Sequence, residues 1–398
     1  MKSHAEPVGG PLYTPAMRAL SVVFGIGAVV MLWRLVAGLG STTALNDGYP
    51  LGLWIAFDVV TGTALACGGY AVAILVIILN KGRYHPLVRP AILTSALGYS
   101  LAGFSVFLDI GRWWYIWKVP VYFWHWNFDS ALLEVALCIM AYVVVLWVEL
   151  APAFFEKWSD ASNLLLRRAS RVSLRALEKA AIWIIALGLL LPTMHQSSLG
   201  TLMLLADSRL HPLWNTRLLP LMFLLTSVSM GFAVVVFESA FSSVAFKRRP
   251  ETSMLAGLAA AIVPIQLAVV AMRVVDLLWR GQLGLLIAGD VRSLLVLLEF
   301  GLMLAPVVML RSAASRRDLG HLVRAAIVMM FAGALYRFDT YLVAFTPGPQ
   351  WSYFPSVPEI LISTGLVAAE IMAYIVIVKT FPILAGRTQP AAPERQAA

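Results

Sequence analysis

Ten long apolar segments dominate this sequence, and they decide what it can fold into. A helix needs about 20 mostly apolar residues to cross the ~30 Å hydrocarbon layer of a bilayer. The chain has 398 residues, of which 60% are hydrophobic and only 13% charged. We predict an all-α membrane protein with spans at about 19–38, 51–79, 88–110, 128–150, 179–204, 218–245, 254–279, 290–310, 320–345 and 359–383.

Basic residues gather in alternate loops between these segments. The loops that are poor in positive charge hold only Arg112, Lys118, Arg209, Arg217 and Arg280. Because positively charged loops stay in the cytoplasm, we expect both termini to be cytoplasmic and the poor loops to face the periplasm of a bacterial cell. The net charge of +9 then reflects orientation in the inner membrane and does not indicate nucleic-acid binding.

One loop stands out by its chemistry. The stretch 109–134 carries a carboxylate at each end, an arginine, a histidine and five tryptophans. Trp and Tyr favour the membrane–water interface because one part of the ring is apolar and another part forms hydrogen bonds. We predict that this periplasmic loop forms one wall of a site where a lipid-soluble molecule meets protons.

Two short patterns recur at a constant spacing along the chain. The sequence 180–182 with Gly188 returns as 325–327 with Gly333. The two copies are four predicted helices apart, which preserves their orientation and indicates parallel repeats. We therefore predict two four-helix bundles at 51–204 and 205–345, two flanking helices within 19–50 and 346–383, and cytoplasmic tails at 1–18 and 384–398.

Acidic residues inside the predicted spans are costly in hydrocarbon, so each suggests a partner or a task. We predict proton transfer through six of them: Asp58, Asp109, Glu134, Glu299, Glu370 and Glu238. The first three fall in the outer third of the membrane, the next two near mid-depth, and the last closer to the cytoplasm. The alternative is that such residues lock helices together, as Asp58 would by pairing with Arg337.

Three further expectations concern the helices themselves. Arg34, near the outer end of the first span, is expected to extend its charged group to the membrane surface. No helix is expected to be interrupted at mid-membrane, apart from bends at Pro264 and Pro306. His195 is placed at the outer end of the span 179–204.

Metal centres are not expected in this chain. Two cysteines, Cys67 and Cys138, cannot hold an iron–sulfur cluster or a structural zinc ion. A b-type haem needs two facing histidines on spanning helices, and the six histidines provide no such pair. We therefore predict no haem, no iron–sulfur cluster and no other metal.

Several motifs in order resemble the NrfD/PsrC family of quinone-reactive membrane subunits, and within it the branch found in hydrogenase-2-type nickel–iron hydrogenases. They are Asn46-Asp47-Gly48-Tyr49-Pro50, Trp54-Ile55-Ala56-Phe57-Asp58, Tyr84-His85-Pro86-Leu87-Val88-Arg89-Pro90, Asp109-Ile110-Gly111-Arg112, Leu191-Pro192-Thr193-Met194-His195-Gln196-Ser197-Ser198 and Tyr353-Phe354-Pro355. The resemblance implies a haem-free subunit that passes electrons between a periplasmic ferredoxin-like iron–sulfur subunit and the quinone pool. It also implies a complex with the hydrogenase small and large subunits.

These observations combine into one hypothesis, a site for menaquinone or ubiquinone near the outer face. Its predicted quinone-binding residues are His195, Arg112, Trp54, Trp113, Gln196 and Asp47. His195 and Arg112 would donate hydrogen bonds to the quinone oxygens, and the two tryptophans would cover the ring. Two alternatives stay open, a quinol-oxidising subunit of a polysulfide, nitrite or thiosulfate-type reductase and, from a different class, a transporter.

Overall fold

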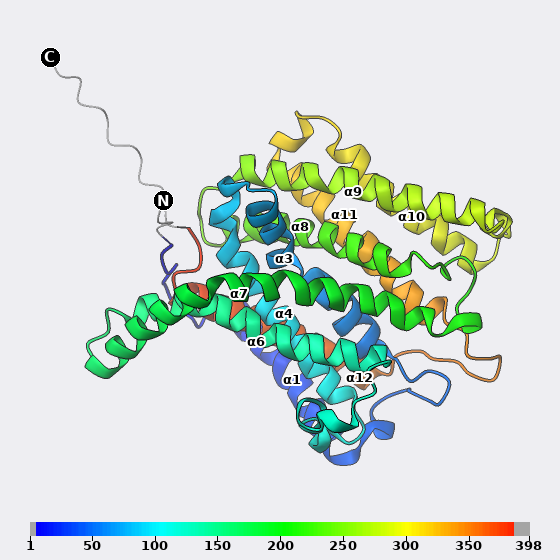
Figure 1. Cartoon of the computed structure of the whole chain (residues 1–398), viewed down its shortest axis with the longest axis horizontal. Helices are drawn as coiled ribbons and strands as arrows, with labels where there is room; N and C mark the ends of the chain where they lie inside the picture. Colours follow the sequence, from blue (N-terminus) through cyan, green and yellow to red (C-terminus); the bar gives the residue numbers. More distant parts are fainter. Residues whose placement is uncertain (1–4, 386–398) are drawn as a thin grey trace.

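A computed structural model describes residues 5–385, so parts of the two tails expected at 1–18 and 384–398 lie outside the described residues. Long helices make up most of it (Figure 1): α1 (Pro15–Ala37), α4 (Val88–Asp109), α6 (Ala131–Trp158), α7 (Leu164–Leu204), α8 (Leu219–Ala245), α9 (Thr252–Trp279), α10 (Val291–Leu310), α11 (Leu319–Phe338) and α12 (Val357–Thr380). The short α-helices are α2 (Gly62–Leu65), α3 (Gly68–Ala73) and α5 (Lys118–Val121), and the π-helical segments are η2 (Trp54–Thr61), η3 (Ile74–Ile78) and η10 (Asp339–Val343). Short 3₁₀ segments are η1 (Leu39–Ser41), η4 (Gly82–Leu87), η5 (Trp113–Tyr115), η6 (Phe123–His125), η7 (Asp207–Arg209), η8 (Leu283–Ile287) and η9 (Ser315–Arg317).

The predicted all-α membrane fold is confirmed. Within the described residues, nine helical segments are long and apolar enough to cross a membrane. The tenth expected span, 179–204, forms the second part of the 41-residue helix α7. At 1.5 Å per residue α7 is about 60 Å long, roughly twice the hydrocarbon thickness. Its first part, which carries Arg167, Arg168, Arg171 and Arg175, therefore extends beyond the membrane layer.

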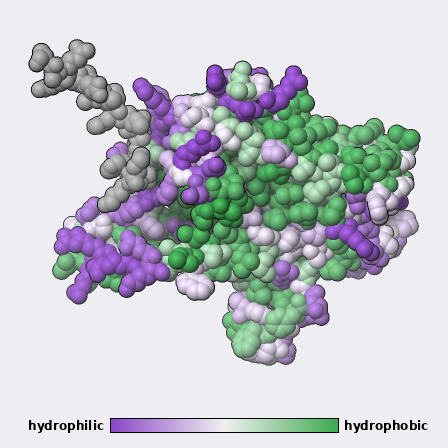
Figure 2. All heavy atoms as spheres, turned by 45° about the horizontal axis from the view of Figure 1, so that its top comes forward, coloured by the Kyte–Doolittle hydropathy of each residue, from purple (hydrophilic) through white to green (hydrophobic). Residues whose placement is uncertain are grey.

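Hydrophobic side chains cover the middle of the molecule, while hydrophilic ones gather where the two described ends of the chain meet (Figure 2). Ala5 and Ala385 are joined there by a β-bridge. We call this end the terminal face, and the opposite end, where the loop 110–130 lies, the tryptophan face. Side chains such as Ile182 and Trp183 of α7 are more than 70% exposed, which fits a surface that contacts lipid.

The helices pack mainly as neighbours in sequence. Helix α6 packs along α7, α8 packs on α9 and α11, and α10 packs on α11. Helix α8 also contacts α2, α3 and α7, and α12 lies against both α1 and α4. The division into two bundles with two flanking helices stays a prediction, since α8 and α12 join the parts closely.

Side-chain caps fix where several helices begin. Ser130 at the start of α6 accepts a hydrogen bond from the Leu133 amide at 3.3 Å. At the start of α12, Ser356 and Glu359 form a reciprocal capping box. Such caps satisfy backbone N–H groups that a helix leaves unpaired in its first turn.

The second span departs from the prediction of uninterrupted helices, which was wrong here. It is assembled from η2, α2, α3 and η3, with a break at Ala66–Cys67 between α2 and α3. The break lies where α8 comes closest, because a Cβ atom on Gly231 would be only 2.5 Å from the Cys67 carbonyl oxygen. By contrast, Pro264 and Pro306 lie inside the continuous helices α9 and α10.

Candidate functional site

His195 is fully buried at an inner position of α7. The sequence placed it at the outer end of the span 179–204, but His195 lies nine residues before Leu204, where both that span and α7 end. Its ring meets the Tyr99 ring edge-on, with centroids 5.5 Å apart. Tyr99 is ten residues before the end of α4, so His195 lies about 15 Å below the last turn of that helix.

Thr63 decides how the His195 ring is protonated. The Thr63 hydroxyl donates to the Val59 carbonyl at 2.6 Å, which uses its one proton. His195 Nε2 lies 3.2 Å from the same oxygen, so this nitrogen must carry a proton and donate it. In the neutral ring Nδ1 is then a hydrogen-bond acceptor, and it has no partner among the described residues.

Gln196 completes the arrangement. Its side-chain nitrogen donates to the Thr63 oxygen at 3.0 Å and to the Tyr99 hydroxyl at 3.3 Å. Its carbonyl oxygen Oε1, like His195 Nδ1, is buried without a partner within the described part of the chain. Two neighbouring side chains thus offer unpaired acceptors, which suits a ligand that presents hydroxyl groups.

Aromatic and sulfur groups enclose this pair, and the sequence analysis did not identify them as site residues. Tyr99 packs edge-on against Tyr142 of α6 at 4.6 Å. The Tyr99 hydroxyl also lies 3.8 Å from the Cys67 sulfur, at the break in the second span. The signal available in the sequence was weak, because Tyr99 and Thr63 stand in segments that read as ordinary apolar helices.

Asp58 is a buried carboxyl group held by two hydroxyls. Its Oδ2 accepts hydrogen bonds from Ser105 of α4 at 3.1 Å and from Ser363 of α12 at 2.9 Å. The alternative pairing with Arg337 was wrong, because that guanidinium donates to the Val60 and Phe223 carbonyls. Asp58 therefore joins three helical segments, and among the described residues it has no cationic partner.

Two further predicted proton carriers lie along α12 and α8. Glu370 is close enough to Asp58 for their charges to interact. Glu238 accepts hydrogen bonds from Thr94 at 2.7 Å and from Tyr374 at 2.6 Å. Glu238 also lines a crevice at the terminal face, together with Pro86 of η4 and other residues from the start of α4 and the end of α8. Acidic groups thus follow one side of the molecule from the crevice to Asp58.

Asp109 and Arg34 lie at the last turn of α4. Arg34 is fully buried and donates to the Leu108 and Ile110 carbonyls, both at 2.8 Å. Its expected extension to the membrane surface was wrong, because the guanidinium caps the carbonyl end of α4 instead. Asp109 is half-buried and lies close enough to Arg34 for their charges to interact.

The two predicted ring-covering tryptophans form hydrogen bonds with the backbone. The Trp54 indole is buried and donates to the Glu359 carbonyl at 3.3 Å. The Trp113 indole donates to the Leu35 carbonyl at 3.2 Å. These contacts fix both rings, and their role in covering a quinone stays a prediction.

Tyr353 lies outside the spans and links the start of the second span to α12. It accepts a hydrogen bond from the Leu53 amide at 2.7 Å and donates to the Glu359 carboxylate at 2.6 Å. Burial raises the pKa of Tyr353 above its ordinary value, which keeps its hydroxyl protonated as the donor.

The structure places the remaining predicted residues at a different depth from His195. Arg112 and Asp47 are exposed in loops of the tryptophan face. Glu134 is half-buried in the first turn of α6, eight residues and thus about 12 Å before Tyr142. The predicted residues therefore occupy two levels, a shallow one with Arg112, Asp109 and Glu134 and a deep one with His195 and Gln196.

Comparison with known proteins gives a consistent result. The family model described as "Polysulphide reductase, NrfD" matches residues 41–338. The chain is 42% identical to HybB, the probable Ni/Fe-hydrogenase 2 b-type cytochrome subunit of Escherichia coli (strain K12). This alignment extends over 389 residues and covers 96% of each of the two chains. A protein of Nitratidesulfovibrio vulgaris is 31% identical over 383 residues, which cover 94% of this chain and 95% of that one. The menaquinone reductase integral membrane subunit of the same organism is 33% identical over 184 residues, 46% of this chain and 42% of its own.

The name of the first of these relatives refers to a b-type cytochrome, and a b-type haem would need two opposed histidines on spanning helices. His195 is the fully buried histidine of the described part of the chain, whereas His85 and His125 are exposed in the short 3₁₀ segments η4 and η6. The Nε2 of His195 is already bonded to Thr63. The described histidines do not provide the opposed pair that a b-type haem requires.

Proposed function

The chain belongs to the NrfD family, and on this premise we propose that it is the quinone-reactive membrane subunit of a nickel–iron hydrogenase complex. In this role it exchanges electrons between a periplasmic ferredoxin-like iron–sulfur subunit and menaquinone or ubiquinone. The hydrogenase small and large subunits complete the complex. The 42% identity over 96% of both chains to a hydrogenase 2 membrane subunit supports this choice.

The unpaired acceptors of His195 and Gln196 suit the reduced form of the substrate. A quinone that takes up two electrons also takes up two protons and becomes a quinol with two hydroxyl groups. His195 Nδ1 and Gln196 Oε1 would each accept a hydrogen bond from such a hydroxyl. His195 would then act as an acceptor at the quinol, whereas the sequence analysis expected it to donate to a quinone oxygen.

The carboxyl groups would move the protons. Glu238 lies at the crevice on the terminal face, and Glu370 and Asp58 follow along the same side. If the terminal face is cytoplasmic, as the basic loops indicate, this order would bring protons from the cytoplasm to the quinone. Asp109 and Glu134 would exchange protons with the periplasm at the shallow level.

A second candidate function has one observation in its favour. The menaquinone reductase subunit matches about half of this chain, so a quinol-oxidising subunit of another reductase is the alternative. Co-purification separates the two, since a nickel–iron large subunit bound to this chain supports the hydrogenase and another catalytic subunit contradicts it. A transporter has no support in these relatives.

The test of the site uses His195→Gln in the complete complex in membranes. Gln keeps a polar side chain but cannot carry a proton, so hydrogen-dependent quinone reduction, in which protons are delivered to the quinone, should fall by about 100-fold, as for loss of a general acid–base group. The matched control is His85→Gln, at an exposed position of the terminal face, which should leave the rate unchanged. Normal turnover by the His195 variant with an assembled complex would contradict the assignment.

A further inference from the structure

A buried polar cluster lies in the part of the molecule formed by α9, α10 and α11. Glu299 of α10 is fully buried. Its carboxylate forms an ion pair with Arg273 of α9 and accepts a hydrogen bond from the Trp214 indole at 3.0 Å. Glu299 thus has a cationic partner on another helix, as in the alternative that such residues lock helices together, and its predicted role in proton transfer stays a prediction.

A second carboxyl group reaches the same place. Asp339, at the start of η10 and 1% exposed, lies within hydrogen-bonding reach of the Glu299 carboxyl group. The nearby charges that act on Asp339 are those of Glu299 and Arg273. Arg337, two residues earlier, donates to backbone carbonyls and to Thr226 and does not compensate this charge.

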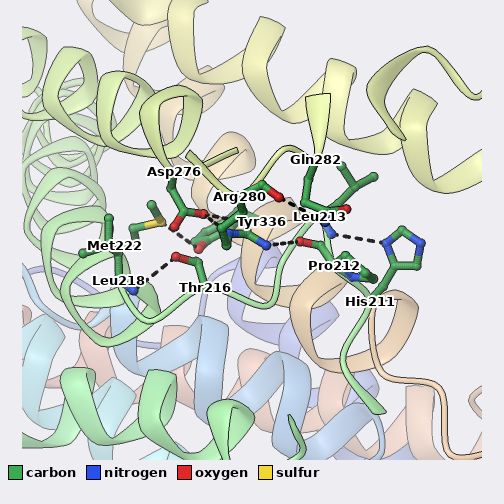
Figure 3. Close-up of polar contacts among 10 residues, drawn as sticks. All are labelled: His211, Pro212, Leu213, Thr216, Leu218, Met222, Asp276, Arg280, Gln282 and Tyr336. Carbon is green, nitrogen blue, oxygen red and sulfur yellow. Dashed lines mark hydrogen bonds and ion pairs between the residues drawn. The ribbon is translucent and has the colours of Figure 1, made fainter. Parts of the chain in front are cut away.

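The remaining neighbours supply no further positive charge. The Tyr336 ring lies under the Arg273 guanidinium, whose centre is 4.8 Å from the ring centroid. On the side of the tryptophan face, Arg280 donates two hydrogen bonds to Asp276 Oδ2, from Nε at 2.8 Å and from Nη2 at 2.5 Å, so the charges of these two side chains compensate each other (Figure 3). His211, further out in the loop, accepts a hydrogen bond from the Leu213 amide, and burial lowers its pKa, which favours the neutral ring.

The charges inside the cluster therefore do not balance if both carboxyl groups are ionised. One guanidinium would face two carboxylates, and an uncompensated buried charge costs several kcal/mol. Two ionised carboxylates also cannot hydrogen-bond to each other, because neither has a proton to donate. We propose that Glu299 and Asp339 share one bound proton, which makes the cluster neutral. This inference does not depend on the proposed quinone chemistry.

Unpaired polar atoms show how far the polar region extends. Both polar atoms of Gln266, the Nη2 of Arg273 and the Oδ2 of Asp339 are buried without a partner among the described residues. Gln266 is two turns before Arg273 on the same face of α9. Groups of this kind are usually satisfied by internal water.

The polar region does not continue to the terminal face. Beyond Gln266 the buried side chains of these helices are apolar, including Ile262 of α9, Met303 of α10 and Met329 of α11. On the opposite side the loop 205–218 contributes Trp214 to the cluster, and Arg280 donates to the Pro212 carbonyl of this loop at 2.8 Å (Figure 3). The cluster is thus separate from the carboxyl groups that lead to Asp58.

Infrared difference spectroscopy of the purified complex, with exchange from H₂O to D₂O, tests the shared proton. The wild type should show the carbonyl band of a protonated carboxylic acid that is lost in both Asp339→Asn and Glu299→Gln. Asp276→Asn serves as the control, because Asp276 pairs with Arg280 outside the cluster, and this change should leave the band in place. A band that survives both substitutions in the cluster would overturn the proposal.

Thermal unfolding of the Asp339→Asn complex gives an independent answer if the spectra overlap. An amide donates the same hydrogen bond as a protonated carboxyl group, so the midpoint should stay near that of the wild type. If both groups were ionised, the neutral amide would remove a repulsion between buried charges and raise the midpoint clearly. A clear rise would therefore refute the shared proton.

Discussion

Replacing Thr63 with valine should impair the proposed quinone site while leaving the fold in place. Valine has nearly the same shape, but it removes the oxygen that accepts hydrogen bonds from His195 and Gln196. A buried donor left without an acceptor costs about 1–3 kcal/mol. The His195 ring would avoid this cost by moving its proton to Nδ1, which would then no longer accept a hydrogen bond from a quinol.

We therefore expect a loss of about 1–3 kcal/mol in transition-state stabilisation, or about 5- to 150-fold in hydrogen-dependent quinone reduction. The assay uses membranes that contain equal amounts of assembled complex. Thr61→Val is the matched control, since Thr61 is equally buried and donates only to the Ala56 carbonyl of its own segment. In a variant that already carries His195→Gln, adding Thr63→Val should lower the rate little further, because both changes remove the same interaction. Equal rates for Thr63→Val and Thr61→Val would refute the assignment of the ring proton.

The remaining predictions concern packing and cofactor content. Gly231→Ala should lower the unfolding midpoint by several degrees, because its Cβ would lie 2.5 Å from the Cys67 carbonyl oxygen and overpacking costs about 1–3 kcal/mol. Gly301→Ala, where nothing lies within 4 Å of the added carbon, should be neutral or stabilising, and equal losses in the two variants would contradict the close contact at Cys67. The purified chain should show no haem absorption in reduced-minus-oxidised spectra, and a stoichiometric b-type spectrum would disprove the histidine argument.

The sequence predicted the helices well because a bilayer imposes a simple rule of length and polarity on each span. It failed where backbone geometry depends on a neighbour. The break at Cys67 lies where α8 comes close at Gly231, and a single segment read alone does not reveal this contact. Pro264 shows the reverse case, in which a residue that often bends a helix lies inside a continuous one.

The sequence named some residues of the candidate site but did not predict how they are arranged in space. The motif around His195 and Gln196 marked two polar residues in a span whose end was predicted correctly, but their depth depends on how α7 packs against Tyr99 of α4 and Thr63 of the second span. Partners such as Thr63 and Tyr99 were missed, because an isolated hydroxyl in an apolar segment gives no pattern. The role of Arg34 was also misjudged, since only the folded structure shows that the end of α4 lies within its reach.

The contact of the first and last helices bears on how the protein matures in the cell. Gly27 of α1 and Gly365 of α12 come so close that a Cβ atom on either glycine would lie 2.8 Å from the Cα of the other. Of the two hydroxyl groups that donate hydrogen bonds to Asp58, one belongs to Ser363 of α12. Until α12 has been synthesised and inserted, Asp58 would thus lack one of its two hydrogen-bond donors inside the lipid bilayer, where an incompletely satisfied acidic group is costly.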